Sequence, residues 1–450
     1  MGKELFGTDG IRGVAGEYPL DPATVHAVGV ALGSEARRLA EDPEILIGMD
    51  TRESSPWIAE QVAGGLRRRG VHVRSAGLIT TPGVAYLTRT GPFAAGVMIS
   101  ASHNPYRDNG IKVFGHSGFK LPDEEEHLVE QEIFRLLEEG VQPEPAPLEP
   151  EPAFDQQYLE FLISTMSTLL TGVRVVLDCG NGAASQLAPD LFSRLGAAPI
   201  AVNRMPDGRN INLHCGAMHV EGLRDRVLAE RADFGVAFDG DADRAIFVSG
   251  SGRIVDGDAV LLVAGRALKA AGRLPGDVVV ATVMSNLGLE KALARHGIGM
   301  ARTPVGDKYV LEEMVRREAA LGGEQSGHVI FREYATTGDG LLTALRLFEI
   351  AVRAGAGLDE LISELEVYPQ RLVNVRVRER RPFEEIPSVA EAIGRCREIF
   401  GDAGRVLVRY SGTEPLARVM VEGPDLQSVE DCTARIAGAI EREIGLAKGA

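Results

Sequence analysis

The chain of 450 residues is poor in cysteine and in aromatic residues, and it contains no long apolar run. Its four cysteines, Cys179, Cys215, Cys396 and Cys432, lie far apart and form no CxxC pair, so neither a zinc site nor a disulfide framework is indicated. No stretch reaches the roughly 18 apolar residues of a membrane span, and the first residues have no apolar signal core. We therefore expect reduced thiols and a soluble, cytoplasmic protein with no membrane partner.

Basic residues are also in the minority. Lys and Arg total 48 against 64 Asp and Glu, a formal net charge of −16. This balance argues against a general nucleic-acid or anionic-membrane surface, so an anionic substrate would need a local basic pocket. Glycine, in contrast, is abundant at 53 residues without a collagen-like period, which predicts many tight loops. At about 100 to 200 residues per domain, the length predicts three or four domains.

One pattern recurs three times along the chain: an apolar strand, a turn of small polar residues, an amphipathic helix ending at glycine, and a second strand. The three first strands begin near residues 45, 173 and 278, and the helices are expected to end at Gly70, Gly196 and Gly297. Strands that are apolar throughout indicate parallel strands buried on both faces. The last 80 residues follow the order β-α-β-β-α. The predicted fold class is therefore α/β, with three mixed-sheet βαβ-type domains and a C-terminal α+β domain.

The clearest boundary is the segment 141–153, VQPEPAPLEPEPA, in which prolines alternate with acidic residues. Proline has no amide hydrogen and a fixed φ, so this segment can form neither a helix nor a central strand. We predict a stiff strap between two domains.

A short acidic loop is the strongest chemical signal. The motif DGDADR places Asp239, Asp241 and Asp243 between two apolar strands. Three carboxylates this close repel one another strongly unless a cation binds, and all-oxygen ligands favour Mg²⁺ over a soft metal. The alternative is a solvated acidic turn.

A second loop, SASHNP, follows an apolar strand and offers Ser100, Ser102 and His103, with Lys112 a little further on. A hydroxyl group can accept a phosphoryl group, and a metal cluster elsewhere in the chain could neutralise the resulting phosphoserine as a reactive intermediate. The alternative is a polar turn in which the serines only cap the loop.

Two further loops suit a sugar and a phosphate. GEQSGH combines Glu324, Ser326 and His328, a set of donors and acceptors that fits hydroxyl groups; the alternative is a tight loop with a satisfied histidine. RYSGTEP lies between two strands and provides a guanidinium fork, hydroxyls and backbone amides for an anion; the alternative is a plain hairpin loop. Its candidate ligands are Arg409, Ser411, Gly412, Thr413 and Arg418. Arg12, in FGTDGIRG, is uninformative by itself.

Together the motifs GTDGIRG, SASHNP, DGDADR, GEQSGH and RYSGTEP, in this order, resemble the phosphohexomutase superfamily, and most closely its bacterial subgroup that acts on glucosamine phosphates. The resemblance implies four domains around a central cleft, the fourth with a fold like that of the TATA-binding protein. We place them at 1–150, 151–254, 255–367 and 368–450, carrying the phosphoserine, metal, sugar and phosphate loops respectively.

The implied activity is reversible conversion of glucosamine 6-phosphate into glucosamine 1-phosphate, for amino-sugar nucleotide and cell-wall precursor synthesis. It would use Mg²⁺, and glucosamine 1,6-bisphosphate would be intermediate and activator. The partner would be a small-molecule sugar phosphate, with no nucleic acid and possible homodimer formation. A phosphomannomutase or phosphoglucomutase of the same superfamily is the alternative.

The resemblance also implies roles for individual residues. Ser102 would carry the phosphate and would bind Mg²⁺ together with Asp239, Asp241 and Asp243. Lys112 and His328 match positions assigned to proton transfer, and Arg12 and Arg244 match positions that stabilise the transferring phosphoryl group. His103 is a further catalytic candidate. Glu324 and Ser326 would hold sugar hydroxyls, and Arg409, Ser411, Gly412, Thr413 and Arg418 would hold the phosphate that does not react.

Two alternatives come from other functional classes. In a phosphatase of the haloacid-dehalogenase type, the nucleophile would be Asp239, presented with Asp241 after an apolar strand, and Ser102 would be dispensable. That hypothesis leaves the other four motifs unexplained. In a catalytically silent sugar-phosphate sensor, a nucleophile or a metal ligand would be missing, yet Ser102 and all three aspartates are present.

Overall fold

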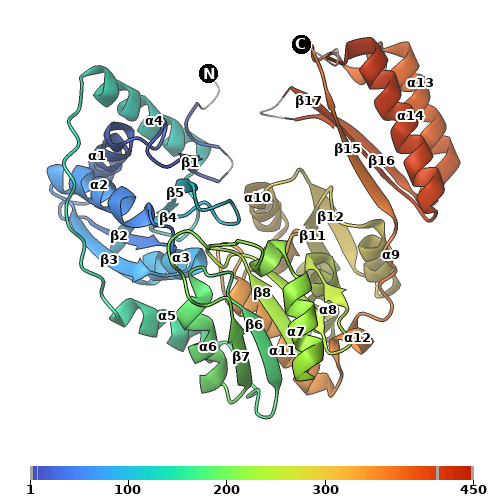
Figure 1. Cartoon of the computed structure of the whole chain (residues 1–450), viewed down its shortest axis with the longest axis horizontal. Helices are drawn as coiled ribbons and strands as arrows, with labels where there is room; N and C mark the ends of the chain where they lie inside the picture. Colours follow the sequence, from blue (N-terminus) through green and yellow to red (C-terminus); the bar gives the residue numbers. More distant parts are fainter. Residues whose placement is uncertain (1–3, 8, 412–414, 447–450) are drawn as a thin grey trace. The chain divides into compact units, whose positions relative to one another are not determined.

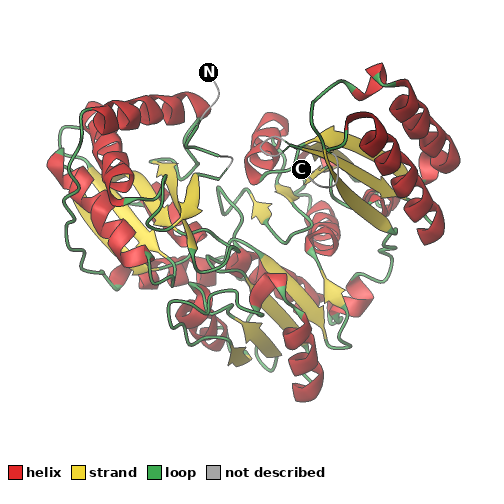
Figure 2. Ribbon diagram, turned by 45° about the horizontal axis from the view of Figure 1, so that its top comes forward, coloured by secondary structure: helices red, strands yellow, loops and turns green. Residues whose placement is uncertain are grey.

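The computed structural model describes residues 4–7, 9–411 and 415–446. The described residues form two compact units. The first extends to Met284 and includes Ile298–Ser363; the second comprises Ser285–Gly297 and the residues from Glu364 onward. Three mixed sheets lie in the first unit and one antiparallel sheet in the second, each flanked by helices (Figures 1 and 2). This architecture confirms the predicted fold class.

The first sheet has the strand order β1-β5-β4-β2-β3, in which β2 is parallel to β3 and β4, whereas β5 is antiparallel to β4 and β1. Its strands are β1 (Ile11–Val14), β2 (Glu44–Met49), β3 (His72–Leu78), β4 (Phe93–Ile99) and β5 (Asp108–Gly115). Its helices are α1 (Pro22–Leu39), α2 (Ser55–Arg68), α3 (Thr81–Thr90) and α4 (Asp123–Glu138).

Both faces of this sheet are covered, as expected for apolar parallel strands. Ile45 and Ile47 of β2 are buried in one cluster with residues of α1, α2 and α4, which lie together on one face (Figure 1). On the other face, a Cβ added at Gly48 would lie 2.5 Å from Val84 of α3. Glycine therefore lets α3 pack directly on the sheet, and the first turn of α3 contacts the acidic loop described below.

The second and third sheets repeat the same plan, with parallel strands from one edge to the centre and antiparallel pairing toward the other edge. The second has the order β10-β9-β8-β6-β7 and the third β12-β11-β13-β14. The strands are β6 (Arg174–Asp178), β7 (Ala198–Val202), β8 (Phe234–Phe238), β9 (Ala245–Ser249), β10 (Ile254–Val255), β11 (Val278–Thr282), β12 (Gly299–Thr303), β13 (Leu321–Gly323) and β14 (Val329–Phe331). The helices of this part of the first unit are α5 (Ala153–Ser164), α6 (Ala184–Arg194), α7 (Glu221–Glu230), α8 (Gly257–Ala270), α10 (Asp307–Arg317), α11 (Gly340–Ala354) and α12 (Leu358–Leu361), with short 3₁₀ turns at Gly216–Met218 and Pro275–Asp277.

The threefold pattern in the sequence is confirmed. The three predicted strand pairs, β2 with β3, β6 with β7 and β11 with β12, are all parallel. The glycines expected to follow the helices have φ of 70° at Gly70, 83° at Gly196 and 65° at Gly297, in the left-handed region that favours glycine.

From β15 onward, the second unit has the order β-α-β-β-α that was predicted for the last 80 residues. Its elements are α9 (Leu287–Arg295), β15 (Gln370–Arg376), α13 (Pro387–Phe400), β16 (Arg405–Tyr410), β17 (Leu416–Glu422) and α14 (Leu426–Ile444), with 3₁₀ turns at Phe383–Glu385 and Gly401–Ala403. The strands pair antiparallel in the order β15-β17-β16. Apolar residues of α13, α14 and the sheet form a separate core, so this unit has its own hydrophobic interior.

The proline-rich segment is extended, as predicted, over residues 141–152, whereas Ala153, the last residue of the predicted strap, already begins α5. The amide of Ala146 donates to the carbonyl of Glu60 (2.9 Å), and that of Glu151 donates to Ser75 (2.9 Å). A Cβ at Gly64 would lie 1.7 Å from the carbonyl oxygen of Glu144, so only glycine lets the strap pass this close to α2.

All four cysteines are buried and form no disulfide bond. Across residues 4–7, 9–411 and 415–446, none of the helices combines the length and the apolar character needed to cross a bilayer.

A buried carboxyl group joins α5 to α11. Asp339 caps α11 by accepting from the Leu342 amide (2.9 Å), and its other oxygen accepts from the Tyr158 hydroxyl (2.8 Å). Burial raises the pKa of Asp339 to about 6, which exceeds the ordinary value of 3.8. Ionisation of Asp339 therefore costs free energy in the folded protein.

This shift predicts a pH-dependent stability. Between pH 3.8 and about 6 the folded state binds more protons at Asp339 than the unfolded state, so the free energy of unfolding falls as pH rises through this window. Asp339→Asn keeps a cap acceptor but cannot ionise. We would measure the free energy of unfolding of the variant and of the wild type in urea at pH 4 and at pH 7. We expect the variant's value minus the wild-type value to rise by about 2 kcal/mol from pH 4 to pH 7. An equal stability difference between variant and wild type at both pH values would contradict the raised pKa of Asp339.

Candidate active site

The three aspartates lie on a tight turn between the buried strands β8 and β9, which pair antiparallel up to Phe238 and Ala245. Ala242 has a φ of 57° and closes the turn. One carboxylate oxygen each from Asp239, Asp241 and Asp243 lies within 4.8 Å of the others, and all three residues are buried. The first turn of α3 holds the loop, since the Thr81 amide donates to the carbonyl of Asp241 (3.0 Å) and its hydroxyl donates to the carboxylate (2.5 Å).

The donor set of this turn fits Mg²⁺. Oδ1 of Asp241 and Oδ1 of Asp243 are buried without a hydrogen-bond partner among the described residues. Burial, followed by the charges of Asp243 and Asp241, raises the pKa of Asp239 well above its ordinary value. Buried carboxylate oxygens that are close together and unpartnered are typical ligands of a hard divalent cation.

Ser102 lies against this turn. It is 1% exposed, follows the end of β4, and has a φ of 53°, a left-handed conformation that costs an L-residue about 1 to 2 kcal/mol. Its hydroxyl donates to Oδ2 of Asp239 (2.6 Å) and lies 3.3 Å from Nδ1 of His103. The fold therefore places the predicted phosphoserine directly beside the predicted metal ligands.

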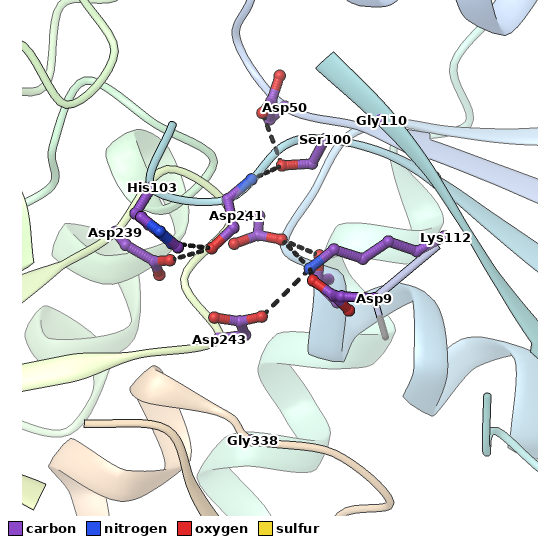
Figure 3. A network of polar contacts seen from close by, with 12 residues as sticks. Asp9, Asp50, Ser100, His103, Gly110, Lys112, Asp239, Asp241, Asp243 and Gly338 are labelled. Carbon is purple, nitrogen blue, oxygen red and sulfur yellow. Dashed lines mark hydrogen bonds and ion pairs between the residues drawn. The ribbon is translucent and has the colours of Figure 1, made fainter. Parts of the chain in front are cut away.

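Lys112 reaches the same turn from β5. Its Nζ lies 2.9 Å from Asp241 Oδ2 and 3.3 Å from Asp243 Oδ2 (Figure 3), and its side chain is 1% exposed. Burial by itself would lower the pKa of Lys112, but Asp241, Asp9 and Asp243 outweigh it and raise the pKa well above the ordinary value. In this arrangement Lys112 is an ammonium ion that can donate a proton or neutralise negative charge.

Asp9 is a site residue that the sequence analysis missed. Its carboxylate contacts Arg12, Lys112 (3.1 Å) and Lys120, and Lys120 also contacts Asp307 at the first turn of α10. Despite burial, Lys112 and the other two cations lower the pKa of Asp9 well below its ordinary value. The one feature of the sequence that could have indicated Asp9 is its position in the motif GTDGIRG.

Arg12 and Arg244 bring further positive charge. Arg12 lies on β1, and Arg244 follows the aspartate turn, where its amide donates to Asp239 Oδ1 (3.1 Å). The buried Nε atoms of both arginines have no hydrogen-bond partner among the described residues. Burial, Arg244 and Arg12 together lower the pKa of His103 to about 4, so its ring is neutral near pH 7. Unused guanidinium donors beside a nucleophilic hydroxyl suit a phosphoryl group.

The sugar-loop candidates lie in the turn between β13 and β14. The Ser326 hydroxyl donates to Glu324 Oε2 (3.1 Å), and Ser326 is exposed. Nε2 of the buried His328 accepts from the Gly338 amide (3.2 Å), whereas its Nδ1 has no partner among the described residues. In the neutral ring the proton is therefore on Nδ1, the atom available to a ligand.

The phosphate-loop candidates lie on the β16–β17 hairpin of the second unit. Arg409 and Arg418 are direct partners across the two strands. Burial and the charge of Arg418 lower the pKa of Arg409. Like charges directly opposite on a sheet are destabilising. Nη2 of Arg418 donates to Ser411 Oγ (3.4 Å). The other two candidates, Gly412 and Thr413, lie outside the described residues.

Comparisons with known proteins identify the family of this chain. Four models of the phosphoglucomutase/phosphomannomutase family match in chain order: α/β/α domain I at 3–139, domain II at 156–252, domain III at 256–368 and the C-terminal domain at 372–439. A phosphoglucosamine mutase of Solibacter usitatus is 68% identical, with 99% of this chain and 100% of that protein covered.

Two solved structures show the same fold. A phosphoglucomutase/phosphomannomutase family protein from Burkholderia thailandensis matches with a TM-score of 0.79 and 25% identity, over 98% of this chain and 99% of that one. An Aspergillus fumigatus N-acetylphosphoglucosamine mutase, solved with GlcNAc-6P and magnesium, matches with a TM-score of 0.63 and 19% identity, over 98% and 96% of the two chains. This chain therefore belongs to the phosphoglucomutase/phosphomannomutase family and, within it, to the phosphoglucosamine mutases.

Proposed function

We propose that this protein interconverts glucosamine 6-phosphate and glucosamine 1-phosphate by way of a phosphate on Ser102. The observation that carries the proposal is the 2.6 Å contact of the Ser102 hydroxyl with Asp239, within a buried set of three carboxylates. The name and the full-length similarity of the Solibacter relative support this substrate.

In the first step, the O1 hydroxyl of glucosamine 6-phosphate forms a bond to the phosphorus of phosphoserine 102. The bond from phosphorus to Oγ of Ser102 breaks, and Oγ takes up a proton in place of the one that the sugar hydroxyl loses. The product, glucosamine 1,6-bisphosphate, turns around. Oγ of Ser102 then loses its proton and bonds to the phosphorus of the 6-phosphate. The bond from that phosphorus to O6 breaks and O6 takes up a proton, which yields glucosamine 1-phosphate and restores the phosphoserine. Transfer of this kind depends mainly on positioning and on neutralising charge.

We assign roles to the residues of this chain accordingly. Asp239, Asp241 and Asp243 would hold Mg²⁺ with the Ser102 phosphate, and the ion would neutralise charge on the transferring group. Arg12 and Arg244 would bind the equatorial oxygens. Lys112, an ammonium ion, would balance the charge on Ser102 as its bond breaks, and Nδ1 of His328 would exchange a proton with the sugar oxygen. His103, whose ring is neutral near pH 7, would lie beside Oγ of Ser102 during the transfer.

The remaining candidates would bind the substrate away from the reacting atoms. Glu324 and Ser326 would hold sugar hydroxyls. The hairpin of the second unit would hold the phosphate that is not transferred, through Arg409, Ser411, Gly412, Thr413 and Arg418. We further propose that glucosamine 1,6-bisphosphate also activates the enzyme by phosphorylating free Ser102, that the protein is cytoplasmic, and that it can form a homodimer.

The sugar preference tests this function. A coupled assay would compare the 6-phosphates of glucosamine, glucose and mannose, with Ser102→Ala as the background. We expect kcat/KM to be highest for glucosamine 6-phosphate, by about 10²-fold, because polar groups that recognise one substituent are left unpaired by another. An equal or higher kcat/KM for glucose or mannose phosphate would favour the alternative mutases.

A further inference from the structure

The backbone of Ser102 is in a conformation that its own side chain disfavours. Its φ of 53° is readily adopted by glycine but rarely by serine. Such a conformation persists only where the surroundings fix the peptide groups on both sides of the residue. In this protein both groups are held by side chains, of which the sequence analysis named Ser100 but not Arg52.

Three side chains, those of Asp50, Arg52 and Ser100, form a closed ring of hydrogen bonds with Ser102. The Ser102 amide donates to Ser100 Oγ (2.9 Å), which donates to Asp50 Oδ2 (2.7 Å; Figure 3). Nε of Arg52 donates to the same Asp50 oxygen (2.8 Å), and Nη2 of Arg52 donates to the Ser102 carbonyl (2.9 Å). The ring therefore fixes the amide and the carbonyl of Ser102 relative to each other.

All the hydrogen-bond donors of the Arg52 guanidinium are occupied within this part of the fold. Its side chain has no exposed surface, and its charge is balanced by the equally buried Asp50. The guanidinium makes five hydrogen bonds, one to Asp50 and four to backbone carbonyls. The four carbonyls belong to Ser102, Asn104, Pro105 and Asp108. No donor is left for a substrate, so Arg52 can act only through the backbone of the loop.

A second donor comes from the part of the chain that carries the metal turn. Nδ2 of Asn212 donates to the Ser102 carbonyl (2.9 Å) and to that of Asn104 (3.3 Å), while the Asn212 amide donates to Gly180 (2.8 Å). Asn212 is 7% exposed. It therefore links the serine loop to the α/β/α domain that holds the three aspartates.

We propose that Arg52 and Asn212 are positioning residues that hold Ser102 in its left-handed conformation, with Oγ directed at Asp239. This inference rests on the proposed function for its catalytic consequence. Without either residue the loop can relax, and the phosphoserine moves away from the transferring geometry. Because the donors of both side chains go to Asp50 and to backbone carbonyls of this loop, we expect the loss to fall on the rate of phosphoryl transfer and not on substrate affinity.

Asn212→Ala is the test, with Asn210→Ala as the matched control. Asn210 lies in the same loop and uses its side chain only within it, with bonds to Asp207 and Met205. In single turnovers of the phosphorylated enzyme with glucosamine 6-phosphate, we expect Asn212→Ala to lower the transfer rate about 10- to 100-fold with KM unchanged. Asn210→Ala should stay within about twofold of the wild type.

Arg52→Lys is the second variant. Lysine keeps the charge but lacks the fork that reaches several carbonyls at once, so it should not rescue the transfer rate. Wild-type rates in Arg52→Lys or Asn212→Ala would overturn the inference. An equal loss of transfer rate in Asn210→Ala would also overturn it, as would a change in KM with an unchanged transfer rate.

A measurement that does not depend on catalytic activity separates this inference from the proposed function. Amide hydrogen exchange of residues 100–108 should accelerate about 10-fold in Asn212→Ala and not in Asn210→Ala, because the loop opens more often. Unchanged exchange would overturn the positioning role even in an active enzyme. A wild-type protein with no mutase activity, but with this exchange difference, would refute the proposed function and leave the positioning of Ser102 intact.

Discussion

Ser102→Ala is expected to lower mutase activity by about 10⁴-fold or more, since the hydroxyl that carries the phosphoryl group is lost. Ser102 is buried, and its hydroxyl makes a 2.6 Å contact with Asp239, so alanine leaves no hydroxyl group at this position to carry the phosphate. The fold should be kept because alanine removes only one oxygen atom. The measurement is the coupled assay, together with the intact mass before and after incubation with glucosamine 1,6-bisphosphate.

Ser34→Ala is the control for this variant. Ser34 bonds to the carbonyl of Val30 within α1, away from the site, and its loss should leave activity and phosphorylation unchanged. An active Ser102→Ala variant with the phosphate mapped to Asp239 would contradict the mechanism and favour a phosphatase with an aspartate nucleophile.

Lys112→Met is expected to lower kcat by roughly 10² to 10⁴-fold, the range for losing a proton-transfer or charge-stabilising group. Methionine nearly matches the length of lysine but has no charge. Asp241, Asp243 and Asp9 would then lose the ammonium group that lies between 2.9 and 3.3 Å from each of them. The measurement is steady-state kinetics at saturating Mg²⁺.

Lys308→Met is the matched control. Lys308 forms an ion pair with Asp123, and its loss removes a charge without touching the aspartate turn. Its kcat should stay within about twofold of the wild type, as expected for an outlying ion pair. A Lys112→Met variant as active as Lys308→Met would remove Lys112 from the mechanism.

Local patterns predicted the elements well. The three strand–helix–strand segments, their terminal glycines and the β-α-β-β-α order of the last residues all follow from apolar periodicity and turn chemistry. The β16–β17 hairpin could be predicted for the same reason, although the direct pairing of Arg409 with Arg418 needed the register. The aspartate turn was evident because three carboxylates between apolar strands have few structural explanations.

Contacts between distant segments could not be predicted from residue patterns. Antiparallel pairing of β1 with β5 places Arg12 opposite Gly110, two residues from Lys112, and no local signal specifies that pairing. Asp9 was overlooked because its partners, Lys112 and Lys120, are more than 100 residues away in the chain. Arg52 had no distinguishing signal in the sequence, since four of the five bonds of its guanidinium go to backbone carbonyls, which any residue supplies.

The most direct test of the central claim follows the phosphoryl group itself. The enzyme would be labelled with ³²P at Ser102, freed of excess label and mixed with unlabelled glucosamine 6-phosphate in a single turnover. Our account predicts that the label leaves Ser102 and appears in glucosamine 1,6-bisphosphate and then in glucosamine 1-phosphate, with little inorganic phosphate. Label that stays on the protein, or that appears mainly as inorganic phosphate, would contradict it.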